Sequence, residues 1–242
     1  MSKETLLLLP GLLCDEAVWP DQVSGLAHRA QSVIPDYGML DSISAMASHV
    51  LQTAPTEVFN LAGHSMGGRV ALEVVRQAPQ RVRRLALLDT GYEPFAGGEA
   101  GEQEKSKRYA LLERARNSGM REMGKLWAPG MVHPSQLQTP LFEAILDMIE
   151  RRTPAQFEAQ IKALLARPDA EPVLRGINCP TWLICGHDDA WSPYARHEVM
   201  SQMVPAQWSR IEGIKDCGHM STMEKPTEVT ALLNAWLDTP VR

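Results

Sequence analysis

The sequence contains no apolar run long enough to cross a membrane and no recognisable export signal. Its N-terminal apolar run, Leu6–Leu9, ends at Pro10 after four leucines, whereas a membrane-spanning helix needs about 18 or more apolar residues. Leu13 precedes Cys14 at the position where a lipoprotein anchor requires a small residue, and no Ala-x-Ala cleavage site follows. We therefore expect a cytoplasmic protein without a membrane partner.

Basic blocks, metal-ligand motifs and paired cysteines are also lacking. The 242 residues carry a net charge of -5 without a long basic block, which gives no electrostatic footprint for nucleic acid. The seven histidines show no His-Glu-x-x-His spacing, so we expect neither a metal nor a cofactor. The four cysteines form no Cys-x-x-Cys pair. They are predicted to be free thiols, with Cys217 a small buried side chain.

A regular alternation of strand and helix signals organises the chain. Short apolar or β-branched runs predict buried strands at residues 5–9, 32–35, 57–61, 82–89, 179–185 and 207–211. Capping residues and helical periodicity predict helices at 17–30, 42–54, 69–78, 193–203 and 226–237. The alternation predicts an α/β fold with a mostly parallel, doubly wound sheet. The length favours a single domain over residues 1–242.

Residues 92–175 lack a strand signal and interrupt this alternation. Apolar residues recur at helical spacing from Leu141 and again from Phe157, and further helices are predicted at 102–117 and 120–126. Helices inserted after the carboxyl end of a strand would cover a site at that edge, so we predict a substrate cap. Its expected lining residues are Trp127, Met123 and Met148, together with Met120 and Met131. Alternatively, the methionines only pack the cap helices against one another.

The segment Gly63-His64-Ser65-Met66-Gly67 reads Gly-x-Ser-x-Gly and stands where a predicted strand gives way to a helix. A serine at the apex of such a turn is held at positive φ, and the flanking glycines lack the Cβ atoms that would collide. Backbone strain of this kind usually marks function. We predict Ser65 as a nucleophile, although the pattern alone also fits a glycine-rich turn.

Two backbone amides near this turn are candidates for an oxyanion hole. The first amides of the helix after Ser65, Met66 N–H among them, point to a region where negative charge is stabilised. The turn after the first predicted strand is expected to present the amide of Leu12 to Ser65 from the other side. Leu12 and Met66 are therefore the predicted oxyanion donors. Pro10–Gly11 also fits an ordinary strand-ending turn.

A serine hydroxyl needs a base that takes its proton and later returns it to the leaving group. His219 follows the last predicted strand, next to Gly218, and is the predicted base. A carboxylate must then hold the imidazole in the correct tautomer. Asp89 and the pair Asp188 and Asp189 each follow a predicted strand, at the edge of an open sheet where ligands bind. The residues themselves leave the choice of acid open.

Together these motifs resemble the α/β-hydrolase family over nearly the whole chain. The segments that carry the resemblance are Gly63–Gly68, Gly186–Asp189 with Pro193, and Gly218–Met220 with Glu224 and Pro226. The family's Gly-x-x-Asp-x-x-x-Pro pattern implies Asp189 as the acid of a triad and Asp188 as a turn or N-cap residue. Some members carry the acid one strand earlier, which here would be Asp89.

The chain also departs from the family in two places. Many relatives have His-Gly where this chain has Pro10–Gly11, a change that a backbone donor at Leu12 should survive. The chain starts almost at its first core strand, so the family's two leading strands are expected to be absent. A serine at position 65 counts against the haloalkane dehalogenases and epoxide hydrolases of the family, which use an aspartate there.

Within the family, residues 42–82 are similar to the carboxylesterases that remove the methyl group from a carrier-protein-bound pimeloyl ester. Shorter similarities point equally to enol-lactonases and to hydrolases of ring-cleavage products. The resemblance implies a serine hydrolase that cleaves a carboxylic ester of a small or medium acyl substrate through an acyl-enzyme intermediate.

Other activities remain open at this point. The same triad would serve a lactone, a thioester, a carbon–carbon bond or cofactor-free perhydrolysis, and the fold can also act as a ligand-binding protein with low turnover. A carrier-protein partner would need a basic rim on the cap. Five arginines could supply it, although solvated helix faces explain them as well: Arg114, Arg116, Arg121, Arg151 and Arg152.

Overall fold

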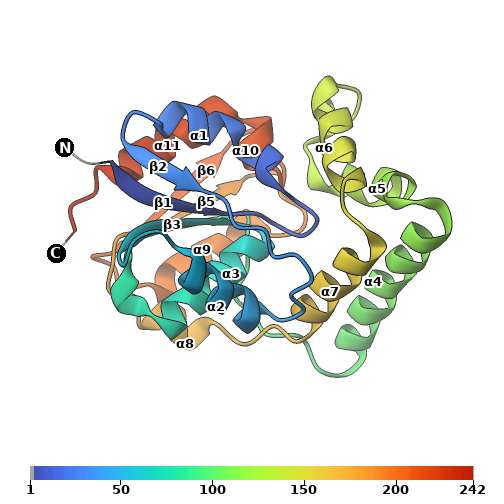
Figure 1. Ribbon diagram of the computed structural model, residues 1–242, viewed down its shortest axis with the longest axis horizontal. Helices are drawn as coiled ribbons and strands as arrows, with labels where there is room; N and C mark the ends of the chain where they lie inside the picture. The colour runs from blue at the N-terminus through green and yellow to red at the C-terminus, as the bar shows by residue number, and fades with distance from the viewer. Residues whose placement is uncertain (1–2, 242) are drawn as a thin grey trace.

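A six-stranded sheet forms the centre of the computed structural model, which describes residues 3–241 (Figure 1). All neighbouring strands pair in parallel, in the order β2-β1-β3-β4-β5-β6. The strands are β1 (Glu4–Leu9), β2 (Ala30–Val33), β3 (Phe59–His64), β4 (Val82–Leu88), β5 (Thr181–Gly186) and β6 (Ser209–Ile214). Each predicted strand is confirmed, with its ends shifted by at most three residues.

Helices cover both faces of the sheet (Figure 1). One face carries α1 (Pro20–Leu26), α10 (Ser221–Glu224) and α11 (Pro226–Leu237). The other carries α2 (Ile43–Thr53), α3 (Met66–Gln77), α8 (Glu171–Arg175) and α9 (Tyr194–Met203). Because both faces are covered, β3 and β5 are buried along their whole length, which explains their mostly apolar sequences. The predicted doubly wound α/β fold is therefore confirmed.

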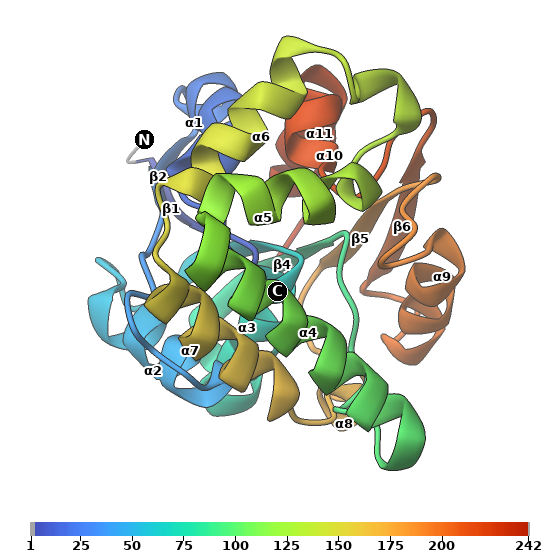
Figure 2. The same cartoon turned by 90° about the vertical axis from the view of Figure 1, so that its right-hand side faces the viewer.

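Four helices, α4 to α7, lie between β4 and β5 in the chain and beyond the carboxyl ends of the strands (Figures 1 and 2). We call them the cap helices: α4 (Gly98–Ser118), α5 (Met120–Trp127), α6 (Pro140–Glu150) and α7 (Pro154–Leu165). They pack on one another as the pairs α4–α5, α5–α6 and α4–α7. None of the helices within residues 3–241 is long and apolar enough to cross a membrane.

The helix predicted over residues 17–30 is shorter than expected. A 3-10 turn covers Glu16–Val18, and α1 begins only at Pro20 and ends at Leu26. Proline has no amide hydrogen and is tolerated only in the first turn of a helix, so a helix could not run through Pro20 from Ala17. The residues after Leu26 instead lead directly into β2.

Candidate active site

Ser65 stands at the sharp turn between β3 and α3. Its backbone has φ of 54° and ψ of -119°, a region that non-glycine residues rarely occupy. A Cβ on Gly67 would lie 2.2 Å from the carbonyl oxygen of Leu9, and one on Gly63 would lie 2.4 Å from the carbonyl oxygen of Gly67. Only glycine permits this close approach of strand and helix, as the sequence pattern predicted.

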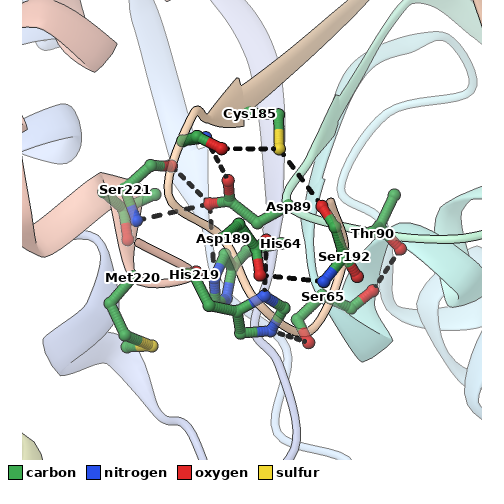
Figure 3. A network of polar contacts seen from close by, with 12 residues as sticks. His64, Ser65, Asp89, Thr90, Cys185, Asp189, Ser192, His219, Met220 and Ser221 are labelled. Carbon is green, nitrogen blue, oxygen red and sulfur yellow. Dashed lines mark hydrogen bonds and ion pairs between the residues drawn. The ribbon is translucent and has the colours of Figure 1, made fainter. Parts of the chain in front are cut away.

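Three side chains from distant parts of the chain meet at this turn (Figure 3). His219 Nε2 lies 2.8 Å from Ser65 Oγ, and His219 Nδ1 lies 2.8 Å from Asp189 Oδ2. Asp189 Oδ1 accepts hydrogen bonds from the amides of Trp191 and Ser192, both at 2.8 Å. The structure thus brings together the three residues that the sequence proposed as nucleophile, base and orienting acid. A proton can pass along this line from the hydroxyl to the imidazole.

The electrostatics of the site favour an ionised acid next to a basic imidazole. Burial alone would raise the pKa of Asp189, but the His219 ring and the amides of Ser192 and Trp191 lower it. Burial alone would lower the pKa of His219, but the Asp189 carboxylate outweighs it and raises this pKa above its ordinary value. An imidazolium formed during a reaction would therefore be stabilised by Asp189.

Asp89, the alternative acid, lies next to this group but is bonded elsewhere (Figure 3). Its carboxyl accepts hydrogen bonds from the amides of Gly186 and Ser221, and Ser221 Oγ lies 2.5 Å from its Oδ2. Within residues 3–241, no hydrogen bond or ion pair joins Asp89 to His219. Burial and the neighbouring Asp189 raise the pKa of Asp89 well above its ordinary value, which disfavours a charge on this carboxyl.

His64 and Glu224 fix the loop that carries His219. His64 Nε2 lies 2.8 Å from the carbonyl oxygen of His219, and burial lowers the pKa of His64 to about 3, so His64 is neutral and donates this bond. The buried Glu224 carboxylate accepts hydrogen bonds from the amides of Gly218 and Met220 on either side of His219. These contacts hold the imidazole over Ser65, and the sequence suggested neither role.

The turn after β1 passes directly over Ser65. A Cβ on Gly11 would come within 3.1 Å of both Ser65 Cβ and His64 Nδ1. Leu12 and Met66 both line the space beside the Ser65 hydroxyl. Among the described residues, neither Leu12 N–H nor Met66 N–H donates a backbone hydrogen bond. The two amides that the sequence predicts as oxyanion donors thus have no competing backbone acceptor.

Side chains of α7 and of the segment between α6 and α7 hold this turn from outside. The amide of Leu13 donates to Gln160 Oε1 of α7 at 2.8 Å, and both residues are buried. Arg151 forms a bidentate ion pair with Asp15, at 2.8 and 2.9 Å. The nearby Arg152 donates to the carbonyl of Cys14 at 2.7 Å. Position 160 gave no functional signal in the sequence, because a glutamine on a helix is ordinary.

A cavity of about 1230 Å³ lies between the sheet edge and the cap helices. Ser65 and His219 line it on the sheet side, and the predicted Trp127 and Met131 line it on the cap side. The Trp127 and Trp191 rings lie 5.0 Å apart, and Trp191 lies 5.1 Å from the His219 ring. The reacting groups therefore open into a large space with an aromatic wall.

Met123 and Met148, predicted to line the pocket, do not border this cavity. Both are fully buried, on helices α5 and α6 that pack directly against each other. Their side chains fill the space between these helices, because methionine adapts to irregular gaps. The prediction for these two residues, and for Met120 with 6% exposure, is therefore corrected in favour of helix packing.

Four of the five arginines proposed as a basic rim are neutralised within the chain. Arg116 binds Glu113 and Glu158, and Arg121 binds Glu143, Asp147 and Glu150. Arg151 and Arg152 pair with Asp15 and Asp36. Arg114 instead lines the cavity. Most of the predicted rim thus consists of paired surface arginines.

Within residues 3–241, two groups of side chains have donor atoms close enough to share a metal ion. Asp89, Cys185 and Asp189 form one, and His133, Asp188 and Asp216 form the other. In the first group, the carboxylates already accept hydrogen bonds from the protein. The second lies at the surface, where acidic groups often cluster without an ion. Neither group gives a reason to assign a metal.

The four cysteines within the described chain are buried free thiols, as predicted. Cys217 lies close to His219 in sequence, but burial raises its pKa far above the ordinary value, so it is not a thiolate nucleophile.

Comparison with known proteins supports the assignment of the fold. The chain is 25% identical over 242 residues to the pimeloyl-[acyl-carrier protein] methyl ester esterase of Nitrosomonas europaea, covering 95% of this chain and 94% of that protein. A malate-bound thermophilic esterase from Thermogutta terrifontis superposes with a TM-score of 0.85 and 28% identity, over 98% of this chain and 90% of the esterase.

A third protein shows the same fold at lower identity. The enol-lactonase from Burkholderia xenovorans superposes with a TM-score of 0.84 and 19% identity, over 99% of this chain and 93% of the lactonase. Residues 6–232 match the alpha/beta hydrolase family as a whole. The chain therefore belongs to the alpha/beta hydrolase family.

Proposed function

We propose that this protein is a serine esterase that cleaves a carboxylic ester through an acyl-enzyme intermediate. The observation that carries the proposal is the hydrogen-bonded line from Ser65 Oγ through His219 to Asp189, with 2.8 Å at each step. The esterases among its relatives support the same chemistry. The line opens into a cavity large enough for a substrate.

In the proposed reaction, Ser65 Oγ attacks the ester carbonyl while His219 accepts its proton. The amides of Leu12 and Met66 stabilise the negative oxygen of the tetrahedral intermediate. The bond to the alcohol then breaks, and the alcohol leaves with the proton from His219. Water repeats the sequence on the acyl-enzyme, with His219 again as base, and releases the acid. Asp189 orients the imidazole throughout.

Lactones, thioesters and carbon–carbon bonds are alternative substrates of the same three residues. The fold neighbour named as an enol-lactonase is the reason to consider a lactone. The relative named for an acyl-carrier-protein ester is the reason to consider a carrier-bound ester. Because most of the proposed basic rim is already paired within the chain, we favour a small-molecule ester over a carrier-bound one.

A p-nitrophenyl ester series from acetate to decanoate tests the proposal. We expect turnover that depends on chain length, because the acyl group must fit the cavity. A fluorophosphonate should inactivate the protein with one adduct on the peptide that contains Ser65, located by mass spectrometry. Turnover of lactones or thioesters but not of these esters would replace the ester proposal. A fluorophosphonate adduct on another peptide, without loss of activity, would show that Ser65 is not the nucleophile.

Gln160 supplies a prediction about the oxyanion turn. Replacing Gln160 with methionine keeps the volume but removes the acceptor for the buried amide of Leu13, which costs about 1–3 kcal/mol when left unpaired. We expect kcat for p-nitrophenyl acetate to fall about tenfold to a hundredfold with little change in KM, since the Leu12 amide acts mainly in the transition state.

Gln160→Glu is the matched control, because it retains an oxygen that can accept the Leu13 hydrogen bond. We expect it to recover much of the lost kcat. Equal losses in both variants, or a fall in stability without a fall in kcat, would mean that Gln160 only packs α7 against the turn.

A further inference from the structure

The net charge of the side chains that line the cavity is opposite in sign to the net charge of the whole chain. The chain carries a net charge of -5, yet the cavity has two carboxylates, Glu93 and Glu104, against six cations. The cations are Arg69, Lys107, Arg108, Arg114, Arg167 and Arg196. The lining therefore has an excess of four positive charges, on walls that also include apolar side chains. A positive cleft of this kind concentrates anions.

The Glu104 carboxylate is shared between two guanidinium groups. Arg167 donates to both oxygens of Glu104, at 2.7 and 2.8 Å, and Arg108 lies 2.8 Å from the same carboxylate. Arg167 Nε is buried and has no hydrogen-bond partner among the described residues. One negative charge thus offsets two positive ones here.

The Glu93 carboxylate also lies between two guanidinium groups. Arg196 Nε donates to Glu93 at 2.9 Å, whereas Arg69 reaches the Glu93 carboxylate only at 4.0 Å and donates to its backbone carbonyl. Arg69 lies one helical turn after Ser65. Burial, with repulsion from Arg167 and Arg196, lowers the pKa of Arg69 to about 9. An anion near Arg69 would relieve that repulsion.

Lys107 and Arg114 complete the positive lining from the opposite wall. Both are on α4, seven residues apart on the face that also presents Leu111 to the cavity. Within residues 3–241, no carboxylate lies within ion-pair distance of either side chain. Glu122, which Arg114 influences electrostatically, forms its ion pair with Lys125 instead. These two cations are free to bind a ligand.

We propose that the cavity holds an anion subsite and that the natural substrate is an ester carrying a carboxylate away from the scissile bond. Ester hydrolysis at Ser65 is the proposed function on which this inference rests. The substrate's ester would lie at Ser65, and its carboxylate would lie between Arg69 on α3 and Lys107 and Arg114 on α4, which line the same cavity. Leu111, beside these cations, would contact its apolar part.

Two pairs of isosteric esters test the inference. Monomethyl adipate against methyl adipamate places the charge on the acyl side, and 4-acetoxybenzoate against 4-acetoxybenzamide places it on the alcohol side. A hydrogen bond to a charged group is worth enough for roughly a tenfold to a hundredfold effect. We expect kcat/KM to favour the carboxylate in one pair by this factor, and added sodium chloride to reduce the preference.

The double variant Lys107→Gln and Arg114→Gln should lower this preference most of the way to unity. The matched control is Lys105→Gln with Lys125→Gln, which removes the same charge from exposed positions on α4 and α5 that do not line the cavity. The control should retain the wild-type preference. An equal loss in the control would assign the preference to the overall charge of the protein.

Equal kcat/KM values for the carboxylates and amides of both pairs would overturn the inference and leave ester hydrolysis standing. If no ester is cleaved, the proposed function fails instead. A binding measurement then tests whether the anion subsite exists. Calorimetric titration of the Ser65→Ala protein with monomethyl adipate and with methyl adipamate then gives the answer. Tighter binding of the carboxylate supports the subsite, whereas equal affinities reject it.

Discussion

Ser65→Ala is expected to abolish turnover of p-nitrophenyl esters, with kcat lower by about a millionfold, the scale seen when a serine protease loses its nucleophile. The imidazole of His219, 2.8 Å from Ser65 Oγ, would have no hydroxyl to deprotonate. Parallel progress curves for wild type and variant, run at high protein concentration, measure the residual rate.

Ser106→Ala is the matched control for this change. Ser106 is exposed on α4 and does not line the cavity, so the variant should retain wild-type kcat and KM. Thermal unfolding of Ser65→Ala should also stay close to wild type, because alanine removes only one half-buried hydroxyl and its hydrogen bond to His219. A Ser65→Ala protein that retains most of its kcat would show that Ser65 is not the nucleophile.

The position of Ser65 could be predicted because its signals are local. A buried strand, a Gly-x-Ser-x-Gly turn and a helix follow one another within about twenty residues, and steric rules alone then place the serine at the edge of the sheet. Asp189 and His219 could be placed at the same edge because each follows a parallel strand. All strands of a parallel sheet end on one side.

The rest of the site depends on how helices rotate against each other, which local sequence does not determine. Met123 and Met148 have the spacing of a buried face, but only the packing of α5 on α6 decides that this face meets another helix and not the cavity. Gln160 reaches Leu13 across 147 positions of sequence. The same holds for Lys107, which reads as an ordinary exposed residue of a charged helix, and for Arg114, which the sequence suggested for a basic rim of the cap and not for the cavity.

The choice between Asp89 and Asp189 was open in the sequence for a related reason. Both follow parallel strands and lie at the same edge, with ligand atoms within 4.8 Å of each other. The loops after the strands make the difference. The amides of Trp191 and Ser192 hold Asp189 toward His219, whereas Asp89 adopts a positive φ of 47° and bonds to the chain around it.

Asp189→Asn is expected to lower kcat for p-nitrophenyl acetate by about ten-thousandfold, as removal of a triad carboxylate does elsewhere. The amide cannot stabilise the imidazolium and favours the wrong tautomer. In the wild type, Asp189 raises the pKa of His219, so the rise of kcat/KM with pH should lie above about 6.5, the ordinary histidine value. In the variant this rise should move to lower pH, because burial then dominates.

Asp89→Asn is the matched control, with the same substitution at the neighbouring buried carboxyl. Because the pKa of Asp89 is raised and that of Asp189 is lowered, a neutral amide of the same shape changes the local charge less at position 89 than at position 189. We expect a much smaller loss of kcat than in Asp189→Asn, because the amide replaces one acceptor oxygen of Asp89 by a donor, and an unshifted pH profile. A ten-thousandfold loss in Asp89→Asn, with Asp189→Asn near wild type, would transfer the orienting role to Asp89. Equal, moderate losses in both, without a shift in the pH profile, would mean that neither carboxylate acts on the imidazole.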